Sequence, residues 1–481
     1  MSYRIILLLG LLIHSSNLNA EIGSTNFEIS QSQLQEIESA GGSIGDYYSG
    51  SGWNGSPQLY VSTLLANPSN AFQFNVTVPN DNMLYGDEAG ETYPYAGFIL
   101  YPTTQSNDRP SYTEPWGTIF PHMQQSNEMP IFEDENTQYP LIVYSHGSGG
   151  YPLWMMDILA TFAEEGYIVM ALFHGDGRFP GISDNVNEYQ KVALRPLSIK
   201  IAIDELENNV DFSGHIDFDR IGAIGLSLGA STTMALLGGE MNGAFGTTRP
   251  TTIDDRIKAA GNFLPWLGNS SFELFGDNHS GLTSVSRPFM AVAGTNDSAA
   301  PFTVTKSAIQ RLIGSKYLIG LTGEEHSLSD EAFRIANVWI HTFLDAFVKN
   351  DNNQLDVLNT LDSVEGSVDN FVEIREYIPP LSIQTPIIPQ DTKILSNYPN
   401  PFNPETTIEY QVIQNSQVQL TIYDIKGNTV KKIVSEFKSA GNYSAHWNGK
   451  NHLNQFVPSG IYIMMMNASN DIATQRILLL K

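Results

Sequence analysis

The stretch "DRIGAIGLSLGAS", Asp219 to Ser231, decides the fold. An apolar run leads into Gly225-x-Ser227-x-Gly229, and small residues and an apolar helical segment follow. A strand that turns this sharply into a helix needs residues without side chains on both sides of the turn. Such a turn presents its serine at the edge of a sheet, above the N-terminus of the helix. The stretch therefore predicts a buried strand, a tight turn and a helix, with Ser227 as a candidate nucleophile.

The same five-residue pattern occurs a second time, as "GGSIG" at residues 41–45. No apolar strand precedes this copy and no helical segment follows it. We therefore interpret Ser43 as part of an irregular segment and not as a nucleophile.

Strand-like and helical segments alternate on both sides of Ser227, over residues 72–350. Apolar runs such as "YPLIVYSHG" and "GYIVMALFH" alternate with helical segments such as "WMMDILATFAEE". This pattern predicts an α/β domain with a mostly parallel central sheet and helices on both faces. An amphipathic helix at 331–350 is expected to close its core. The preceding residues, 21–70, are polar and predict irregular structure with one helix near 31–40.

A different pattern begins after residue 393. Short strands separated by turn residues, at intervals of about ten, predict an all-β, Ig-like sandwich at 394–481. Four prolines in "EYIPPLSIQTPIIPQDTK" predict a semi-rigid linker at 376–393. The α/β domain, including its irregular N-terminal segment, is thus expected to span 21–375.

The first twenty residues resemble a signal peptide in layout. Arg4 precedes an apolar stretch, and a polar segment ends at Ala20, after which cleavage is expected. The apolar stretch is too short to span a bilayer, and no later segment reaches spanning length. The mature protein is therefore expected to be secreted and to have no transmembrane segment.

Composition narrows the classes of function. The formal net charge of the 481 residues is −26, which disfavours nucleic acids and anionic membranes as partners. The chain has no cysteine, which excludes disulfides, thiolate metal sites and cysteine nucleophiles. No convincing metal motif occurs, and we expect no cofactor.

A serine nucleophile needs a histidine base and a carboxylate that orients this histidine. Asp297 follows an apolar strand in "AVAGTNDSAAP", and His326 follows the next strand in "LTGEEHSLSD". Proteins of the fold in which this kind of turn occurs have the chain order Ser, then Asp or Glu, then His. His341 is expected on the more polar side of its helix, away from the sheet edge. We therefore predict Ser227, Asp297 and His326 as a catalytic triad.

The same chemistry needs N–H groups that stabilise an oxyanion. One is expected from Leu228, directly after the nucleophile. The other is expected from the glycine-rich loop "YSHGSGG", at Ser148, with Gly149 as the alternative. We interpret His146 and the later His174 as histidines that organise loops.

Together, "SHGSGG", "DFDRIGAIGLSLGA", "AGTNDSAAP" and "GEEHS" resemble α/β-hydrolases of the dienelactone hydrolase, platelet-activating-factor acetylhydrolase and cutinase-like group. "IKAAGNFLPW" is similar to a segment of the cutinase-like polyester hydrolases, which implies that Trp266 flanks the substrate cleft. Two positions depart from that group. Ser148 stands where an aromatic residue is usual, and Leu226 where His or Trp is usual. Tyr151 or Trp154 could supply the missing aromatic surface.

The C-terminal stretch resembles a second family. "NYPNPFNPETTI", "YDIKGNTV", "WNGKN" and "SGIY" are similar to the type A sorting domain of the type IX secretion system. This resemblance implies type IX secretion machinery as a partner, and a secreted or cell-surface location in a Gram-negative bacterium. A plain Ig-like accessory module is the alternative.

The resemblances imply a secreted serine carboxylic-ester hydrolase that needs no cofactor, with polyesters or cutin-like polymers among its expected substrates. Within enzymes, the alternatives are a small-molecule or lipase-like esterase and a dienelactone-type hydrolase. The absence of cysteine disfavours the last of these, because cysteine is the typical nucleophile of that family. Outside enzymes, the alternative is an inactive secreted protein that binds surfaces.

Overall fold

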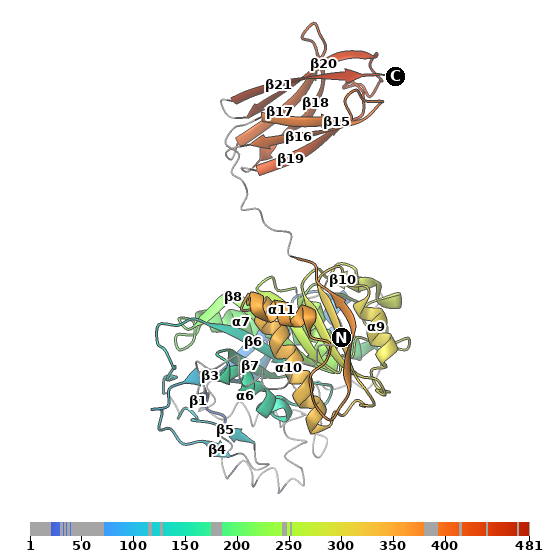
Figure 1. Cartoon of the computed structure of the whole chain (residues 1–481). Coiled ribbons are helices and arrows are strands. Elements are labelled where there is room, and N and C mark those ends of the chain that lie inside the picture. Colours follow the sequence, from blue (N-terminus) through green and yellow to red (C-terminus); the bar gives the residue numbers. More distant parts are fainter. Residues whose placement is uncertain are drawn as a thin grey trace. The chain divides into compact units, whose positions relative to one another are not determined.

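The computed structural model divides the chain into two compact units, residues 1–378 and 379–481 (Figure 1). It describes residues 21–28, 32, 35, 39, 72–113, 118–125, 128–174, 185–242, 248–250, 253–379, 393–412, 416–438, 441–468 and 471–480. The predicted signal peptide, the second glycine–serine pattern and most of the predicted linker lie outside these residues. Of the helix expected near 31–40, Ser32, Gln35 and Ser39 are described and are helical.

The described part of the first unit is built on a ten-stranded sheet. Its order is β1-β3-β7-β6-β8-β11-β12-β13-β14, and β2 also pairs with β3. The strands are β1 (Glu21–Ser24), β2 (Phe72–Thr77), β3 (Thr92–Thr103), β6 (Tyr139–Ser145), β7 (Ile168–Phe173), β8 (Ile216–Leu226), β11 (Ile257–Phe263), β12 (Phe289–Gly294), β13 (Lys316–Leu321) and β14 (Asn370–Glu376).

The centre of this sheet is parallel and its flanks are antiparallel. All neighbours from β7 through β6, β8, β11 and β12 to β13 pair in parallel. The pairs β1–β3, β2–β3, β3–β7 and β13–β14 are antiparallel. The predicted α/β architecture with a mostly parallel centre is confirmed at this level, as a mixed sheet flanked by helices.

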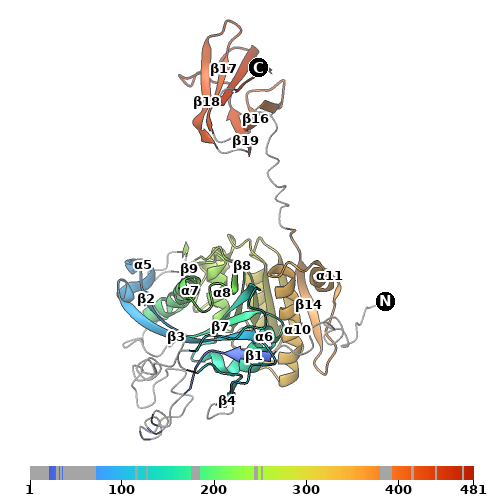
Figure 2. The same cartoon turned by 90° about the vertical axis from the view of Figure 1, so that its left-hand side faces the viewer.

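Helices cover both faces of the sheet (Figures 1 and 2), and an apolar core lies on each face. In β6, Ile142 and Tyr144 belong to the core formed with α6 and α10, whereas Leu141 and Val143 belong to the core formed with α7, α8 and α9. This alternation explains why buried parallel strands are apolar throughout. The helices are α5 (Asn82–Tyr85), α6 (Met156–Glu164), α7 (Asn185–Asn208), α8 (Leu228–Leu236), α9 (Phe302–Ile309), α10 (Asp330–Phe347) and α11 (Asn352–Thr360).

The first unit continues past the helix that was expected to close it. After α10 the chain forms α11 and then β14, which pairs antiparallel with β13. Asn370 at the start of β14 accepts a hydrogen bond from the buried indole N–H of Trp339 in α10, at 3.1 Å. The core of this unit therefore extends past residue 350, where α10 was expected to close it, and includes Leu358, Leu361 and Val364. The edge strand carries the charged residues of "NFVEIRE", which hide its strand pattern.

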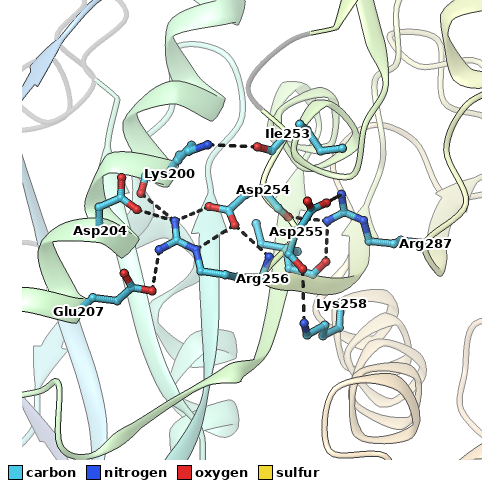
Figure 3. Close-up of polar contacts among 10 residues, drawn as sticks. Lys200, Asp204, Glu207, Ile253, Asp254, Asp255, Arg256, Lys258 and Arg287 are labelled. Atoms are coloured by element: carbon cyan, nitrogen blue, oxygen red, sulfur yellow. Dashed lines mark hydrogen bonds and ion pairs between the residues drawn. The ribbon is translucent and has the colours of Figure 1, made fainter. Parts of the chain in front are cut away.

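A cluster of ion pairs lies at the amino end of β11 (Figure 3). Arg256 donates to Asp254, Asp204 and Glu207, with shortest N–O distances of 2.5, 2.7 and 2.8 Å. The side chain of Asp254 is only 3% exposed. Although burial raises the pKa of Asp254, hydrogen bonds from Arg256 outweigh this effect and hold the pKa below its ordinary value. The cluster fastens α7 to the sheet.

The second unit consists of two antiparallel sheets around its own core. Their orders are β15-β16-β19 and β18-β17-β20-β21. Trp447, Leu420 and Met464 are fully buried between them. The strands are β15 (Lys393–Tyr398), β16 (Thr406–Val412), β17 (Ser416–Tyr423), β18 (Thr429–Lys438), β19 (Gly441–Trp447), β20 (Gly460–Ala468) and β21 (Asp471–Leu479). The predicted all-β character of this region is confirmed.

Short elements complete the described part of the first unit: β4 (Tyr112–Thr113), β5 (Ile119–Phe120), β9 (Glu240–Asn242), β10 (Thr248–Pro250), and the 3-10 helices η2 (Gly86–Glu88), η3 (Pro152–Met155) and η5 (Asp277–Leu282). Among the helices that the structure describes, none has the length and apolar character needed to cross a membrane.

Candidate active site

Four parallel strands bring the predicted site residues to one edge of the sheet. Ser227 directly follows β8, Ser148 follows β6, Asp297 follows β12 and His326 follows β13. Because these strands run in the same direction, the loops after them all emerge at the same edge. Sequence positions 178 residues apart, from 148 to 326, are thus brought together by the strand order.

Ser227 occupies a strained turn between β8 and α8. Its φ of 52° and ψ of −115° lie in a region that residues with side chains rarely adopt. Three backbone hydrogen bonds hold it there: its N–H donates to Phe263 at 3.0 Å, and its carbonyl accepts from Ala230 at 2.9 Å and Trp266 at 3.1 Å. The surrounding structure therefore fixes the serine in this conformation.

The two glycines of the motif are required by close packing. A Cβ on Gly225 would lie 2.5 Å from Oδ1 of Asn262 and 2.6 Å from the backbone nitrogen of Ala230. A Cβ on Gly229 would lie 1.9 Å from the carbonyl oxygen of Ser145. Any larger residue at either position would displace backbone atoms of the turn or of the loop after β6.

Ser227, His326 and Asp297 form a continuous hydrogen-bonded chain. Oγ of Ser227 lies 2.8 Å from Nε2 of His326, and Nδ1 of His326 lies 2.6 Å from Oδ2 of Asp297. The other carboxylate oxygen of Asp297 accepts the backbone N–H groups of Ala299 at 2.9 Å and Ala300 at 2.7 Å. Asp297 is 5% exposed, so its carboxylate is held in a fixed orientation.

This arrangement can move a proton from serine to histidine. With Nδ1–H donating to Asp297, the Nε2 lone pair of His326 faces the Ser227 hydroxyl and can accept its proton. The buried carboxylate would stabilise the resulting imidazolium. The geometry is thus suited to nucleophilic attack by Ser227 on an electrophilic carbon.

A pocket of about 770 Å³ opens at this point. Its lining includes Ser227, His326, Leu228 and Ser148. The remaining walls are mainly apolar: Trp154, Met155, Val192, Leu226, Leu264, Trp266, Phe272 and Phe333. The pocket therefore offers apolar contact surface next to the serine hydroxyl.

Trp266, which the resemblance places beside a substrate cleft, lies in the wall of this pocket. Its ring lies 5.6 Å from that of Phe272, centroid to centroid. Of the two aromatic residues considered as substitutes at the entrance, Trp154 lines the pocket and is 62% exposed. Tyr151 is buried, with its ring 4.7 Å from that of Trp154, and packs behind it.

The predicted N–H donors belong to two segments beside Ser227. Leu228 is the first residue of α8, so its N–H has no partner within the helix. The loop after β6 lies close by, since a Cβ on Gly147 would lie 3.5 Å from Cβ of Ser227. Ser148 lines the pocket, whereas Gly149, the alternative, is not among the lining residues.

His146 and His174 form part of the scaffold under this loop. Nε2 of His146 accepts the backbone N–H of His174 at 3.1 Å, so its Nδ1 carries the proton and donates to the Gly147 carbonyl at 2.8 Å. Nε2 of His174 lies 2.9 Å from the hydroxyl of Ser145. Both histidines are buried and organise the loop.

His341 was expected on the more polar side of its helix, and it is half-buried, whereas the residues on either side of it, Ile340 and Thr342, are buried. Its ring stacks on Phe162 of α6, with centroids 3.6 Å apart, and its Nε2 lies 2.8 Å from Oγ1 of Thr161. Its Nδ1 lies 3.3 Å from a carboxylate oxygen of Glu165. His341 is nevertheless engaged at a helix–helix contact and is not among the lining residues of the pocket.

Arg195, which lies under the same loop, was not predicted from the sequence. This residue of α7 is 1% exposed and donates to the carbonyls of His146 and Gly147. A single arginine in a helical segment is usually solvent-exposed, and no local pattern distinguishes this one.

Comparison with known proteins gives a family match within the second unit. No curated protein matches the chain. Residues 404–471, which include most of the C-terminal sandwich, match the FlgD Ig-like domain.

Proposed function

We propose that the chain is a secreted serine carboxylic-ester hydrolase with an α/β-hydrolase fold in its first unit. One observation carries this proposal: Ser227, held at a strained strand-to-helix turn, is hydrogen-bonded to His326, which is hydrogen-bonded to the buried Asp297. The order of the three residues along the chain and their places after parallel strands also support it.

The reaction proceeds through an acyl-enzyme. Oγ of Ser227 attacks the ester carbonyl carbon while its proton passes to Nε2 of His326. The N–H groups of Ser148 and Leu228 stabilise the negative oxygen of the tetrahedral intermediate. The C–O bond then breaks, and His326 returns the proton to the leaving alcohol. Water, deprotonated by His326, attacks the acyl-enzyme in the same way and releases the acid.

The pocket favours neutral esters with apolar groups. Among the residues that the structure describes, its lining contains aromatic and aliphatic side chains and, apart from His326, no ionisable side chain. Polyesters and cutin-like polymers belong to this class, and the exposed Trp154 at the pocket offers contact area for a chain that extends beyond it. Small esters remain the alternative substrates, because a pocket of about 770 Å³ also accommodates them.

The experiment compares the full chain with Ser227→Ala on p-nitrophenyl esters of increasing acyl length and on an insoluble polyester film. Hydrolysis that disappears in Ser227→Ala supports the proposal, and erosion of the film selects the polymer substrate. A folded protein that hydrolyses none of these esters would contradict it and would favour the inactive surface-binding protein.

We also propose that the two ends of the chain direct its secretion. The N-terminal leader directs export across the inner membrane, and the C-terminal sandwich serves as a sorting domain for the type IX machinery of a Gram-negative bacterium. The test is expression in a bacterium that has this machinery, with and without residues 379–481. Retention of the shortened chain in the periplasm supports the sorting role, and equal release of both forms contradicts it.

A further inference from the structure

Arg195 is buried directly beneath the loop that carries Ser148. It lies in α7, is 1% exposed, and is not among the residues that line the pocket. Its own carbonyl accepts the hydroxyl of Ser198 at 2.8 Å, which helps to fix this part of the helix. A substrate in the pocket would therefore not touch the guanidinium.

The guanidinium engages two successive carbonyls of the loop. Nη1 donates to the carbonyl of His146 at 2.5 Å, and Nη2 donates to the carbonyl of Gly147 at 3.0 Å. Only arginine offers two parallel donors in a rigid planar group, and hydrogen bonds from a charged donor are stronger than neutral ones. The fork therefore fixes the orientation of two peptide planes.

The second of these planes contains the N–H of Ser148. The Gly147 carbonyl also accepts Nδ1–H of His146 at 2.8 Å and the backbone N–H of Gly150 at 3.3 Å. The peptide bond between Gly147 and Ser148 is trans, so its N–H points away from its C=O. With the carbonyl held towards the buried side, the Ser148 N–H is directed to the opposite side, where Ser148 lines the pocket.

We propose that Arg195 is a positioning residue that orients and polarises the Gly147–Ser148 peptide so that its N–H is fixed in place to stabilise the oxyanion. This inference rests on the proposed ester hydrolysis. A donor that is already oriented needs no reorganisation as negative charge develops, and this is the source of its catalytic effect. The positive charge on the carbonyl side also draws electron density from the N–H and makes it a stronger donor.

The test uses the full chain with Arg195→Gln and Arg195→Lys. The rates are measured with p-nitrophenyl butyrate, and binding is measured with an alkyl trifluoromethyl ketone, which forms a tetrahedral adduct with serine. Asp254→Asn is the control, because it weakens an ion-pair cluster at the other edge of the sheet, and Ser227→Ala reports the dependence on the nucleophile. Melting temperatures are recorded for every variant.

We expect kcat of Arg195→Gln to fall about 10- to 100-fold with little change in KM, since a loosened donor costs less than the 10²- to 10³-fold of a deleted one. The inhibition constant of the ketone should rise by the same factor, because the ketone resembles the transition state. Arg195→Lys keeps the charge but lacks the fork, so it should lose part of the rate. Asp254→Asn should lower the melting temperature and leave kcat unchanged.

Wild-type kcat and ketone binding in either folded Arg195 variant would overturn the proposal. The Asp254→Asn variant loses stability but keeps Arg195. If its kcat fell as far as that of Arg195→Gln, stability alone would govern the rate, and the proposal would also be overturned. Should Arg195→Gln fail to fold, Arg195→Lys decides by the same two measurements. A wild-type chain without activity, or a Ser227→Ala variant as fast as wild type, would instead overturn the proposed function.

Discussion

Gly229 packs directly against the carbonyl oxygen of Ser145. A Cβ at Gly229 would lie 1.9 Å from that oxygen and 3.0 Å from the carbonyl oxygen of His146. The first turn of α8 thus lies against the loop after β6, and the two segments that carry the proposed N–H donors touch through a residue without a side chain. The distance between these donors depends on this contact.

Gly229→Ala should therefore separate α8 from the loop and remove ester hydrolysis. The clash involves backbone atoms, which cannot rotate away as a side chain can, so we also expect a destabilisation of about 1–3 kcal/mol. Denaturant unfolding and p-nitrophenyl butyrate hydrolysis measure both effects. Gly214→Ala is the matched control, because nothing lies within 4 Å of its Cβ position. Equal activity of the two variants would contradict this view of the turn.

Asp297→Asn should lower kcat by roughly 10³- to 10⁴-fold, as expected when the histidine is held in the wrong tautomer. The amide oxygen can still accept the N–H groups of Ala299 and Ala300, so the loop should keep its shape. Steady-state kinetics measure the fall in kcat, and a circular dichroism spectrum checks that the fold is unchanged. A variant with at least a tenth of the wild-type kcat would mean that Asp297 does not orient His326.

Asp254→Asn should lower the free energy of unfolding by about 1–3 kcal/mol at pH 7, because it leaves donors of Arg256 poorly paired. The pKa of Asp254 is lowered from 3.8 in the folded state, so its carboxylate contributes stability above pH 3.8. This contribution decreases as the pH falls below 3.8 towards the folded pKa. Urea unfolding gives the free energy of unfolding of wild type and Asp254→Asn between pH 7 and pH 3. The difference between these two free energies should stay constant from pH 7 downwards and become smaller only near pH 3. If the difference in free energy of unfolding became larger as the pH fell, the ionised carboxylate of Asp254 would not be the stabilising group.

Trp154→Ala should impair long substrates selectively. The indole is 62% exposed at the pocket, so its loss removes apolar contact with long acyl chains or polymer and should raise KM for them about tenfold. The KM for p-nitrophenyl acetate should change little. Ile313→Ala is the control, since Ile313 is exposed near the amino end of β13, away from the site edge. An equal change in KM for p-nitrophenyl acetate and for long-chain esters would contradict a role of Trp154 in binding long substrates.

The central strands could be predicted because burial on both faces leaves a continuous apolar signal. Strand β8 and the loop at Ser227 follow directly from "RIGAIGLSLG". The triad residues could be nominated because each follows such a strand. Strand β14 lacked this signal, since "NFVEIRE" forms a half-exposed antiparallel edge. Its assignment depends on pairing with β13, which is a long-range contact.

Side chains that act through tertiary contacts were the least predictable. Arg195 is buried because α7 lies under the loop after β6, and nothing in its neighbouring residues indicates this. His341 was expected on the more polar side of its helix, but its stacking on Phe162 of α6 could not be predicted. In both cases the partner is distant in sequence, so local periodicity carries no information about it.

The most direct test of the central claim is covalent labelling of Ser227. The full chain is treated with p-nitrophenyl phosphonate, which transfers its phosphonyl group to an activated serine, and the modified peptide is located by mass spectrometry. We expect one phosphonyl group per chain, on Ser227, with ester hydrolysis lost in proportion. The His326→Ala variant should be labelled much more slowly than wild type. Modification of another residue, or labelling of His326→Ala as fast as wild type, would contradict it.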